Sequence, residues 1–368
     1  MRISKISVYQ VDLPLTKPYF LSGGRLRFDG LDSTFVKLET DEGLIGWGEG
    51  CPWGHTYLPA HGPGIRAGLE TLAPAILGQD PCALEGLNRA MDVALPGHPY
   101  VKSAIDIAAW DILGQQAGLP LWKLMGGAKQ TGVAVNSSIS TGTPEEMIAL
   151  IRAASAKGYR VHSAKIGGTD WALDRARIEA IEAALPPDEA VTFDVNRAWT
   201  PAAAVSVLGS VSSRSWVEQP CETFEECAHV ATRVPQPIML DECMHTFQDH
   251  LRAWKTGACE GVKVKPNRLG GLTKARQVRD FGVSVGWSMH IEDVGGSALA
   301  DTAAIHLAAS TAQENRLASW LCHDHLAIDP VPGQGVRNVA GLATPPSAPG
   351  LGVVPDMTIL GDAVAVYE

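Results

Sequence analysis

The sequence lacks the features of several large classes of protein. No stretch of its 368 residues approaches the roughly 18 consecutive apolar residues that a membrane-spanning helix needs. Its seven cysteines are scattered without a Cys-x-x-Cys pair, which argues against a disulfide framework or a zinc finger and favours a reducing cytoplasm. No Gly-x-Gly-x-x-Gly follows the first expected strand, which argues against a dinucleotide-binding sheet. The net charge of −10 argues against nucleic acid or an anionic membrane surface as a partner.

The composition that remains is typical of a globular protein. Hydrophobic residues make up 45% of the chain, alongside 38 glycines and 24 prolines. The first residues alternate polar and apolar side chains, which predicts a strand and not a signal peptide. The length suffices for an α/β barrel with a second, smaller domain.

The pattern of strands and helices divides the chain into three parts. Residues 1–125 combine three strand-like runs with three helical periods, which predicts an α+β domain. Residues 126–321 alternate strand and helix, which predicts a barrel. Residues 322–368 are rich in proline and glycine, and we expect this segment to return to the N-terminal unit.

Eight short apolar runs alternate with helical stretches in the predicted barrel. These runs are VAVNSS, VHSAKI, AVTFDV, SWVEQ, PIMLD, GVKVK, GWSMH and ASWLC. Thr143, Thr200 and Thr223 mark helix starts, because each hydroxyl is followed by a proline or acidic residues in the first turn. The alternation favours a barrel over a doubly wound sheet.

Three acidic residues and two lysines recur at a spacing of about one strand plus one helix. Lys165, Asp194, Glu218, Asp241 and Lys265 follow one another at intervals of 29, 24, 23 and 24 residues, each at the end of an apolar run. Because the C-terminal ends of barrel strands face one site, we expect these side chains to converge. Three buried carboxylates without a cation would be costly, and their oxygens suit Mg²⁺ best, with Mn²⁺ as an alternative.

The two lysines predict proton transfer on opposite sides of a metal-bound substrate. A desolvated lysine near a cation has a lowered pKa, which suits a general base. The chemistry implied is removal of the proton α to a carboxylate, with the metal stabilising the resulting enediolate.

Three neighbouring polar residues carry further expectations. Asn196 lies two positions after Asp194, and we expect it to face the same side and to orient a ligand. Glu242 directly follows Asp241 and is expected to face away from it. For Lys263 we expect a salt bridge to a neighbouring carboxylate.

Several motifs resemble those of the enolase superfamily, in particular its muconate-lactonizing subgroup. DVNRAW, VEQP, LDE and KPNRLGGL match in order and spacing, and residues 103–127 resemble the stretch that leads into the barrel. The resemblance covers nearly the whole chain. It implies a modified (β/α)7β barrel capped by an N-terminal α+β domain, and a homo-oligomer. The resemblance also implies that Asp194, Glu218 and Asp241 are the Mg²⁺ ligands. It implies that Lys165 and Lys265 are the two acid/base groups.

One position departs from the subgroup's pattern. Many members have Lys-x-Lys on the second strand, and the first lysine lowers the pKa of the second. Here Ser163 precedes Ala164 and Lys165, so that electrostatic help is missing. Lys263, two residues before Lys265, is the candidate for replacing it in part.

The resemblance also indicates where substrate specificity lies. Two capping loops, residues 15–30 and 48–62, and the last barrel strands determine it in this superfamily. Trp53, Tyr57 and Trp320 are aromatic candidates for holding a cationic amine or a small ring, with plain packing as the alternative. Glu292 and Asp293 are candidates for holding an ammonium group or for capping the next helix.

The pattern PYFLSGGRLRF with GEGCPWGHTYLPAHGPGIRAG looks most like the branch that acts on proline derivatives. That branch contains cis-3-hydroxy-L-proline dehydratases and 4-hydroxyproline betaine 2-epimerases, so the expected substrate is a small amino-acid-type molecule. Dehydration is the leading expectation, and epimerisation of betaines is the alternative. Two further hypotheses are a sugar-acid dehydratase that uses His290 and a barrel that binds a ligand without catalytic activity.

Overall fold

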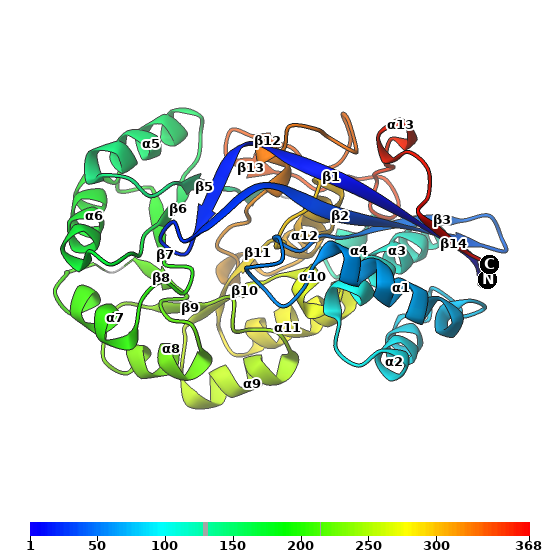
Figure 1. The fold of residues 1–368 in the computed structure, drawn as a ribbon, viewed down its shortest axis with the longest axis horizontal. Coiled ribbons are helices and arrows are strands. Elements are labelled where there is room, and N and C mark those ends of the chain that lie inside the picture. Colours follow the sequence, from blue (N-terminus) through cyan, green and yellow to red (C-terminus); the bar gives the residue numbers. More distant parts are fainter. Residues whose placement is uncertain (128–131, 214) are drawn as a thin grey trace.

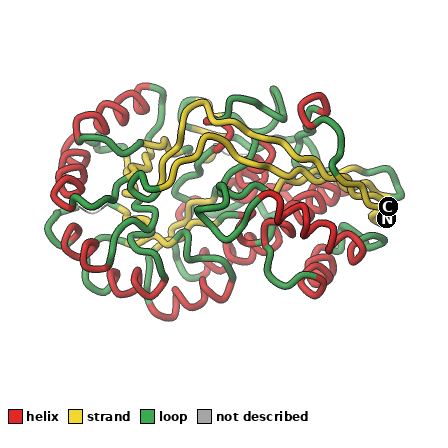
Figure 2. Tube along the Cα trace, viewed as in Figure 1, coloured by secondary structure: helices red, strands yellow, loops and turns green. Residues whose placement is uncertain are grey.

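A curled parallel sheet surrounded by helices forms the larger part of the molecule (Figures 1 and 2). The computed structural model describes residues 1–127, 132–213 and 215–368. The sheet has the order β11-β10-β9-β8-β7-β6-β5, and its strands run parallel. Its strands are β5 (Asn136–Ile139), β6 (Val161–Lys165), β7 (Ala190–Asp194), β8 (Trp216–Glu218), β9 (Ile238–Leu240), β10 (Gly261–Val264) and β11 (Ser288–Ile291).

Helices follow the strands in turn, as the alternation of the sequence predicts. They are α5 (Pro144–Ala156), α6 (Trp171–Ala184), α7 (Pro201–Leu208), α8 (Phe224–Ala231), α9 (Phe247–Thr256), α10 (Pro266–Leu269), α11 (Leu272–Ser284) and α12 (Ala298–Ala309). The three predicted caps are confirmed, because the hydroxyls of Thr143, Thr200 and Thr223 each accept a hydrogen bond from the first turn. Thr143 and Thr223 also form capping boxes with a glutamate three residues later.

The eighth apolar run closes the barrel without forming a regular strand. The Leu317 backbone N–H donates to the carbonyl of Met289 in β11 at 2.8 Å, and the Ser319 N–H donates to the carbonyl of Ala134 at 2.8 Å. The Asn136 N–H of β5 donates back to the Ser319 carbonyl at 2.9 Å. These bonds join both edges of the seven-stranded sheet, so the architecture is the predicted (β/α)7β barrel.

A second, antiparallel sheet has the order β14-β1-β2-β3. Its strands are β1 (Ile3–Leu21), β2 (Leu26–Thr40), β3 (Ile45–Gly50) and β14 (Ala365–Tyr367). Residues 15–30, expected to be a loop, lie mostly in β1 and β2 and form the end of a long hairpin. Figure 1 shows this hairpin reaching across the molecule to the strands β6 and β7 of the barrel.

The helices of the N-terminal part pack against this sheet and the barrel. They are α1 (Gly62–Ile76), α2 (Leu84–Ala94), α3 (Pro99–Ala117) and α4 (Leu121–Leu124). Helix α3 is buried on nearly all sides and lies very close to β3. A Cβ at Gly46 or Gly48 would lie 2.1 Å or 1.9 Å from the carbonyl oxygen of Ala108 or Ala104, so glycine is required at both positions.

Polar contacts fix the N-terminal part on the barrel. The Glu49 carboxylate of β3 is fully buried and accepts from Ser33 Oγ and from the backbone N–H and Oγ of Ser297. Ser297 is the N-cap of α12 in the barrel. Burial raises the pKa of Glu49, and these hydrogen bonds oppose that rise.

The C-terminal residues contact both parts of the molecule. Their elements, together with the remaining short ones, are β4 (Val133–Ala134), η1 (Gln313–Asn315), η2 (Cys322–His325), β12 (Asn338–Val339), β13 (Leu342–Ala343) and α13 (Met357–Leu360). Strand β13 pairs with β4 at the start of the barrel, and β14 pairs with β1.

Candidate active site

A small pocket lies at the C-terminal ends of the barrel strands, beneath the N-terminal part. All five residues of the predicted acid/base and metal set, Lys165, Asp194, Glu218, Asp241 and Lys265, line it. The parallel pairing brings them together, because Asp194 is the register partner of both Lys165 and Glu218. The cavity has a volume of about 50 Å³, so its free space suits a small ligand.

Each of the three carboxylates is paired with a cation. Asp194 accepts from Lys165, Lys263 Nζ lies 3.2 Å from Glu218 Oε2, and Lys265 Nζ lies 2.8 Å from Asp241 Oδ2. Burial alone would lower the pKa of Lys165, but the neighbouring Asp194 and the more distant Tyr19 and Glu218 raise it above its usual value. The lowered pKa expected for a lysine beside a bound cation stays a prediction.

The carboxylates of the pocket are the candidate ligands of a divalent cation. Within residues 1–127, 132–213 and 215–368, no three His, Cys, Asp or Glu side chains stand together as a ready-made metal site. The lysines occupy the carboxylate oxygens in this arrangement. The donors are nevertheless all oxygen, and buried Glu218 Oε2 has the ion pair with Lys263 but no hydrogen bond among the described residues, so the residues fit a hard cation in their chemistry.

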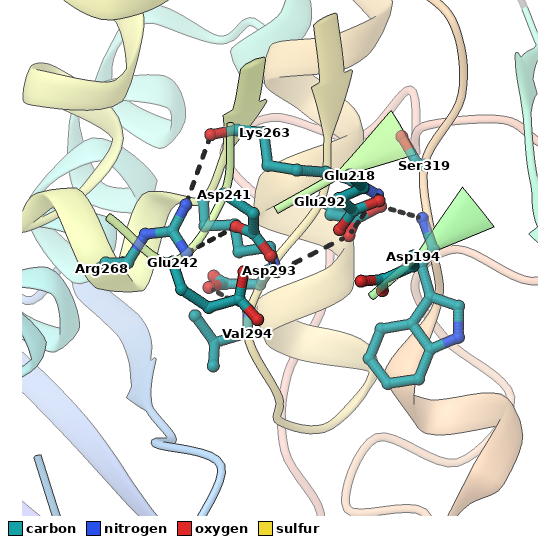
Figure 3. A network of polar contacts seen from close by, with 12 residues as sticks. Asp194, Glu218, Asp241, Glu242, Lys263, Arg268, Glu292, Asp293, Val294 and Ser319 are labelled. Carbon is teal, nitrogen blue, oxygen red and sulfur yellow. Dashed lines mark hydrogen bonds and ion pairs between the residues drawn. The ribbon is translucent and has the colours of Figure 1, made fainter. Parts of the chain in front are cut away.

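Arg268 is a member of the site that the sequence reasoning missed. Its side chain is 1% exposed, and its Nη1 lies 2.6 Å from Asp241 Oδ1 (Figure 3). Burial would raise the pKa of Asp241, but Arg268 and Lys265 lower it well below its usual value. The signal was present in the motif KPNRLGGL, in which an arginine follows Lys265 by three residues at the start of α10.

The predicted acidic pair after β11 divides into two roles. Glu292 lines the pocket, where its Oε1 lies 3.1 Å from Lys263 Nζ and 3.8 Å from Lys265 Nζ. Its Oε2 accepts from the Trp320 backbone N–H at 3.0 Å. Asp293 is turned away from this pocket: its carboxylate accepts from the backbone N–H and side chain of Asn267 and from its own neighbour Val294. Asp293 therefore caps α10, which corrects its assignment as a candidate substrate contact.

Aromatic side chains form one wall of the pocket. Trp53 and Trp320 have ring centroids 5.6 Å apart, and Tyr19 lies 5.1 Å from Trp53 and 6.0 Å from Trp320. Tyr57 lines the pocket as well. The buried Nε1 atoms of both tryptophans have no hydrogen-bond partner among the described residues. Tyr19, which the sequence reasoning did not single out, hydrogen-bonds Ser138 on β5.

The remaining candidates also have defined positions. Ser163 and Asn196 line the pocket, and the Asn196 backbone N–H donates to Asp194 Oδ1 at 3.0 Å. Lys263 forms the expected salt bridge, and it pairs with two carboxylates: Glu218 at the end of β8 and Glu292 just after the neighbouring strand β11. His290 is buried without lining the pocket, and burial lowers its pKa well below the usual value. Glu242, expected to point away, is bonded to Tyr57 and Asn196 of the pocket wall.

Comparison with known proteins assigns the chain to a family. Residues 5–126 match the mandelate racemase / muconate lactonizing enzyme N-terminal domain, and residues 146–359 match the enolase C-terminal domain-like family. The chain belongs to the enolase superfamily. It is an enzyme of the mandelate racemase and muconate lactonizing type, which confirms the resemblance drawn from its motifs.

Two curated relatives and two solved structures are similar to this chain over most of its length. The chain is 41% identical over 370 residues to cis-3-hydroxy-L-proline dehydratase of Roseibium aggregatum, covering 100% of both chains. It is 31% identical to N-succinyl-L-Arg/Lys racemase of Bacillus cereus, covering 84% of this chain and 85% of the relative. Two structures of enolase-superfamily members from Roseovarius nubinhibens, one of them complexed with magnesium, are each 69% identical with a TM-score of 0.97, covering 100% of this chain and 99% of theirs. No helix among the described residues is long and apolar enough to cross a membrane.

Proposed function

We propose that this enzyme removes the proton α to the carboxylate of cis-3-hydroxy-L-proline and eliminates the 3-hydroxyl group, giving Δ1-pyrroline-2-carboxylate. The observation that carries the proposal is the pair of lysines on opposite sides of three carboxylates in one small pocket. The full-length similarity to a cis-3-hydroxy-L-proline dehydratase supports this substrate.

Asp194, Glu218 and Asp241 would hold Mg²⁺, with Mn²⁺ as an alternative. When bound, the cation supplies positive charge that stabilises the substrate carboxylate as negative charge develops on it. The magnesium found with a 69% identical relative supports this choice of metal. Lys165 and Lys265 pair with Asp194 and Asp241 in this structure, and with the carboxylates bound to the cation the two lysines would be available for proton transfer.

The chain's own residues then carry the protons. One lysine takes the α-proton, and the opposite lysine donates a proton to the departing hydroxyl, which leaves as water. The enamine that results tautomerises to Δ1-pyrroline-2-carboxylate. Glu292 provides a negative charge for the ring ammonium group, and the wall of Trp53, Trp320 and Tyr57 excludes water.

A second candidate is 2-epimerisation of proline or hydroxyproline betaines. The same two lysines serve it, since reprotonation of Cα from the opposite side inverts the centre. The tryptophan faces favour this candidate specifically, because a quaternary ammonium group binds an aromatic wall without needing a hydrogen-bond acceptor.

Proton NMR in D₂O with Mg²⁺ tests both candidates against a panel of proline, hydroxyproline and betaine stereoisomers. Loss of the α-signal with formation of Δ1-pyrroline-2-carboxylate from cis-3-hydroxy-L-proline is the expected result. Deuterium at Cα with the ring substituents retained identifies the epimerase. No reaction across the panel would contradict the substrate class, and sugar acids would then be tested next.

Metal binding is tested by calorimetric titration of Mg²⁺ into the metal-free protein. We expect Asp194→Asn, Glu218→Gln and Asp241→Asn each to weaken binding by about tenfold or more, because each removes a charged oxygen donor. Glu182→Gln is the control, since Glu182 lies on α6 and accepts from Ser213 outside the pocket. Undiminished affinity in all three variants would contradict the assignment of the ligands.

The proposal also covers the setting of the enzyme. We place it in the cytoplasm as a homo-oligomer, with residues 1–125 as the capping domain, residues 126–321 as the catalytic barrel and residues 322–368 as the returning segment. Size-exclusion chromatography with light scattering measures the oligomeric state.

A further inference from the structure

The second capping loop, expected at residues 48–62, spans residues 51–61 between β3 and α1 in the structure, and it is attached to the barrel through Tyr57. The Tyr57 ring is buried and lines the pocket, and its hydroxyl donates to Glu242 Oε1. Asn196 Nδ2 donates to the same oxygen at 3.1 Å and lies 3.3 Å from the Tyr57 hydroxyl. Three side chains from separate segments therefore meet at one point of the pocket wall.

Arg197 holds the same tyrosine from a second side. Its Nη2 donates to the Tyr57 carbonyl at 2.7 Å, and its guanidinium lies 5.0 Å from the centre of the Tyr57 ring. Its Nη1 is fixed by Glu222 at 2.8 Å. Arg197 thus contacts both the backbone and the ring, which determines the position of the loop and the orientation of the side chain.

The turn that follows β7 presents both of these residues. Asn196 and Arg197 have φ angles of 44° and 66°, a left-handed conformation that asparagine adopts more readily than most residues. The β1–β2 hairpin binds the same turn, because Ser22 Oγ donates to the Asn196 carbonyl at 2.8 Å. Both cap segments that approach the pocket therefore dock on the residues that directly follow Asp194.

The contacts also connect this docking point with the carboxylates of the site. The Asn196 N–H donates to Asp194 Oδ1 at 3.0 Å, and Glu242 directly follows Asp241 in the chain. A movement of the loop away from Glu242 and Asn196 would therefore remove Tyr57 from the pocket wall and disturb the supports of two carboxylates.

We propose that Glu242, Asn196 and Arg197 form a latch that holds Tyr57, and with it the loop of residues 51–61, closed over the pocket. These are positioning residues, and the closed loop completes the wall that surrounds a bound substrate. The effect of the latch on turnover rests on the proposed function, whereas its effect on the loop does not.

The test is limited proteolysis with chymotrypsin, with cleavage within residues 51–61 located by mass spectrometry. Tyr57→Phe removes the hydroxyl and retains an aromatic residue that chymotrypsin accepts. Glu242→Gln removes the charge and keeps the shape. We expect each variant to be cleaved in the loop about tenfold faster than the native protein, because Tyr57→Phe removes the charge-assisted hydrogen bond and Glu242→Gln reduces it to a neutral one. The double variant is expected to be cleaved no faster than the faster single variant, because both changes break the same bond.

The control is Glu182→Gln, which breaks another carboxylate–hydroxyl contact, between α6 and Ser213, and is expected to leave cleavage of the loop unchanged. Arg197→Gln provides a second variant at a less buried position and is also expected to accelerate cleavage, even where Glu242→Gln fails to fold. Unchanged cleavage in Tyr57→Phe and Arg197→Gln would overturn the latch, and multiplicative effects in the double variant would overturn the coupling.

Kinetics with the substrate identified by NMR give the second readout. We expect KM to rise by about tenfold in Tyr57→Phe and Glu242→Gln, with a smaller change in kcat, because the latch closes the pocket and takes no part in proton transfer. A fall in kcat with KM unchanged would overturn the positioning role. If no substrate in the panel reacts, the proteolysis still tests the latch, so its failure and that of the proposed function remain distinguishable.

Discussion

The two sides of the pocket present the same catalytic residue type in different surroundings. On the β6 side, Lys165 follows Ser163 by two residues and pairs with Asp194. The neighbouring polar groups on this side are neutral: the hydroxyls of Ser163, its register partner Ser138 and Tyr19, and the amide of Asn136. Among the described residues that line the pocket, Lys165 is thus the single cation on this side.

On the β10 side, the corresponding position is a second lysine. Lys263 precedes Lys265 by two residues, and buried Arg268 follows Lys265 by three residues. These three cations face three carboxylates from three strand ends, Glu218, Asp241 and Glu292. Burial alone would lower the pKa of Lys263, but Glu218 and Glu292 raise it above its usual value.

The two sides therefore differ in charge, because the β6 side has a serine two residues before its catalytic lysine and the β10 side has a lysine there. The β10 side forms a closed network in which each buried charge depends on several others (Figure 3). The β6 side depends on one ion pair. We therefore expect the two lysines to differ in their roles, and the β10 side to be far less tolerant of charge removal.

The largest expected effect is that of removing either catalytic lysine. Lys165→Ala and Lys265→Ala should each lower turnover by about 10²–10⁴-fold, because each removes an acid/base group. The two variants should differ in D₂O. The one that lacks the base should lose exchange of the α-hydrogen, and the one that lacks the acid should keep exchange while elimination stops. Proton NMR with cis-3-hydroxy-L-proline measures both reactions.

Circular dichroism on both variants serves as the control for folding. If the two variants behave identically in exchange and in elimination, the expectation that the two lysines have different roles is contradicted.

The next effect concerns the stability of the network on the β10 side. Lys263→Met leaves buried Glu218 and Glu292 with one cation fewer, and we expect the free energy of unfolding to fall by about 3–5 kcal/mol. Urea denaturation of the metal-free protein measures it. The pH–rate profile of the same variant tests whether Lys263 takes over the help that Ser163 does not give, and an unchanged profile would exclude that role.

Lys102→Met is the matched control. Lys102 is equally buried, but its partner Asp92 is 45% exposed and keeps a second lysine, Lys274, at 2.7 Å. The remaining carboxylate is therefore solvated and paired, and a loss of about 1 kcal/mol is expected. Equal losses in the two lysine variants would contradict the view that the β10 network is the costly one to break.

The sequence was most informative where a regular spacing coincides with a strand end. The intervals around Asp194, Glu218 and Asp241 predicted a common pocket, because parallel strands place their C-terminal ends together. Thr143 and Thr223 predicted helix starts for a purely local reason, namely the hydrogen bond of a capping hydroxyl. The eighth run was predicted as a strand, but its attachment to both barrel edges through a few backbone hydrogen bonds depends on the closed geometry of the barrel.

Contacts between distant segments were not predictable from such patterns. The period of two in a strand indicated that Glu242 faces away from Asp241, but the chain leaves the strand after Leu240, so the alternation no longer applies. Asp293 has an acidic side chain like its neighbour Glu292, and only the hydrogen bonds from Asn267 determine that it caps a helix. Arg268 contacts Asp241 from a short helix, and Tyr19 lines the pocket from a hairpin, and no spacing rule exists for either.

The smallest expected effect comes from the position where this chain departs from its subgroup. Ser163→Ala removes a neutral hydroxyl from the wall beside Lys165, and no buried charge loses its partner. We therefore expect kcat/KM to change by less than about threefold, in line with the modest contribution of a neutral hydrogen bond. The stability of the metal-free protein should change far less than in Lys263→Met, which alters the equivalent position on β10. A loss in Ser163→Ala as large as in Lys263→Met would mean that the β6 side depends on a specific hydroxyl contact, and that the difference between the two sides is not one of charge.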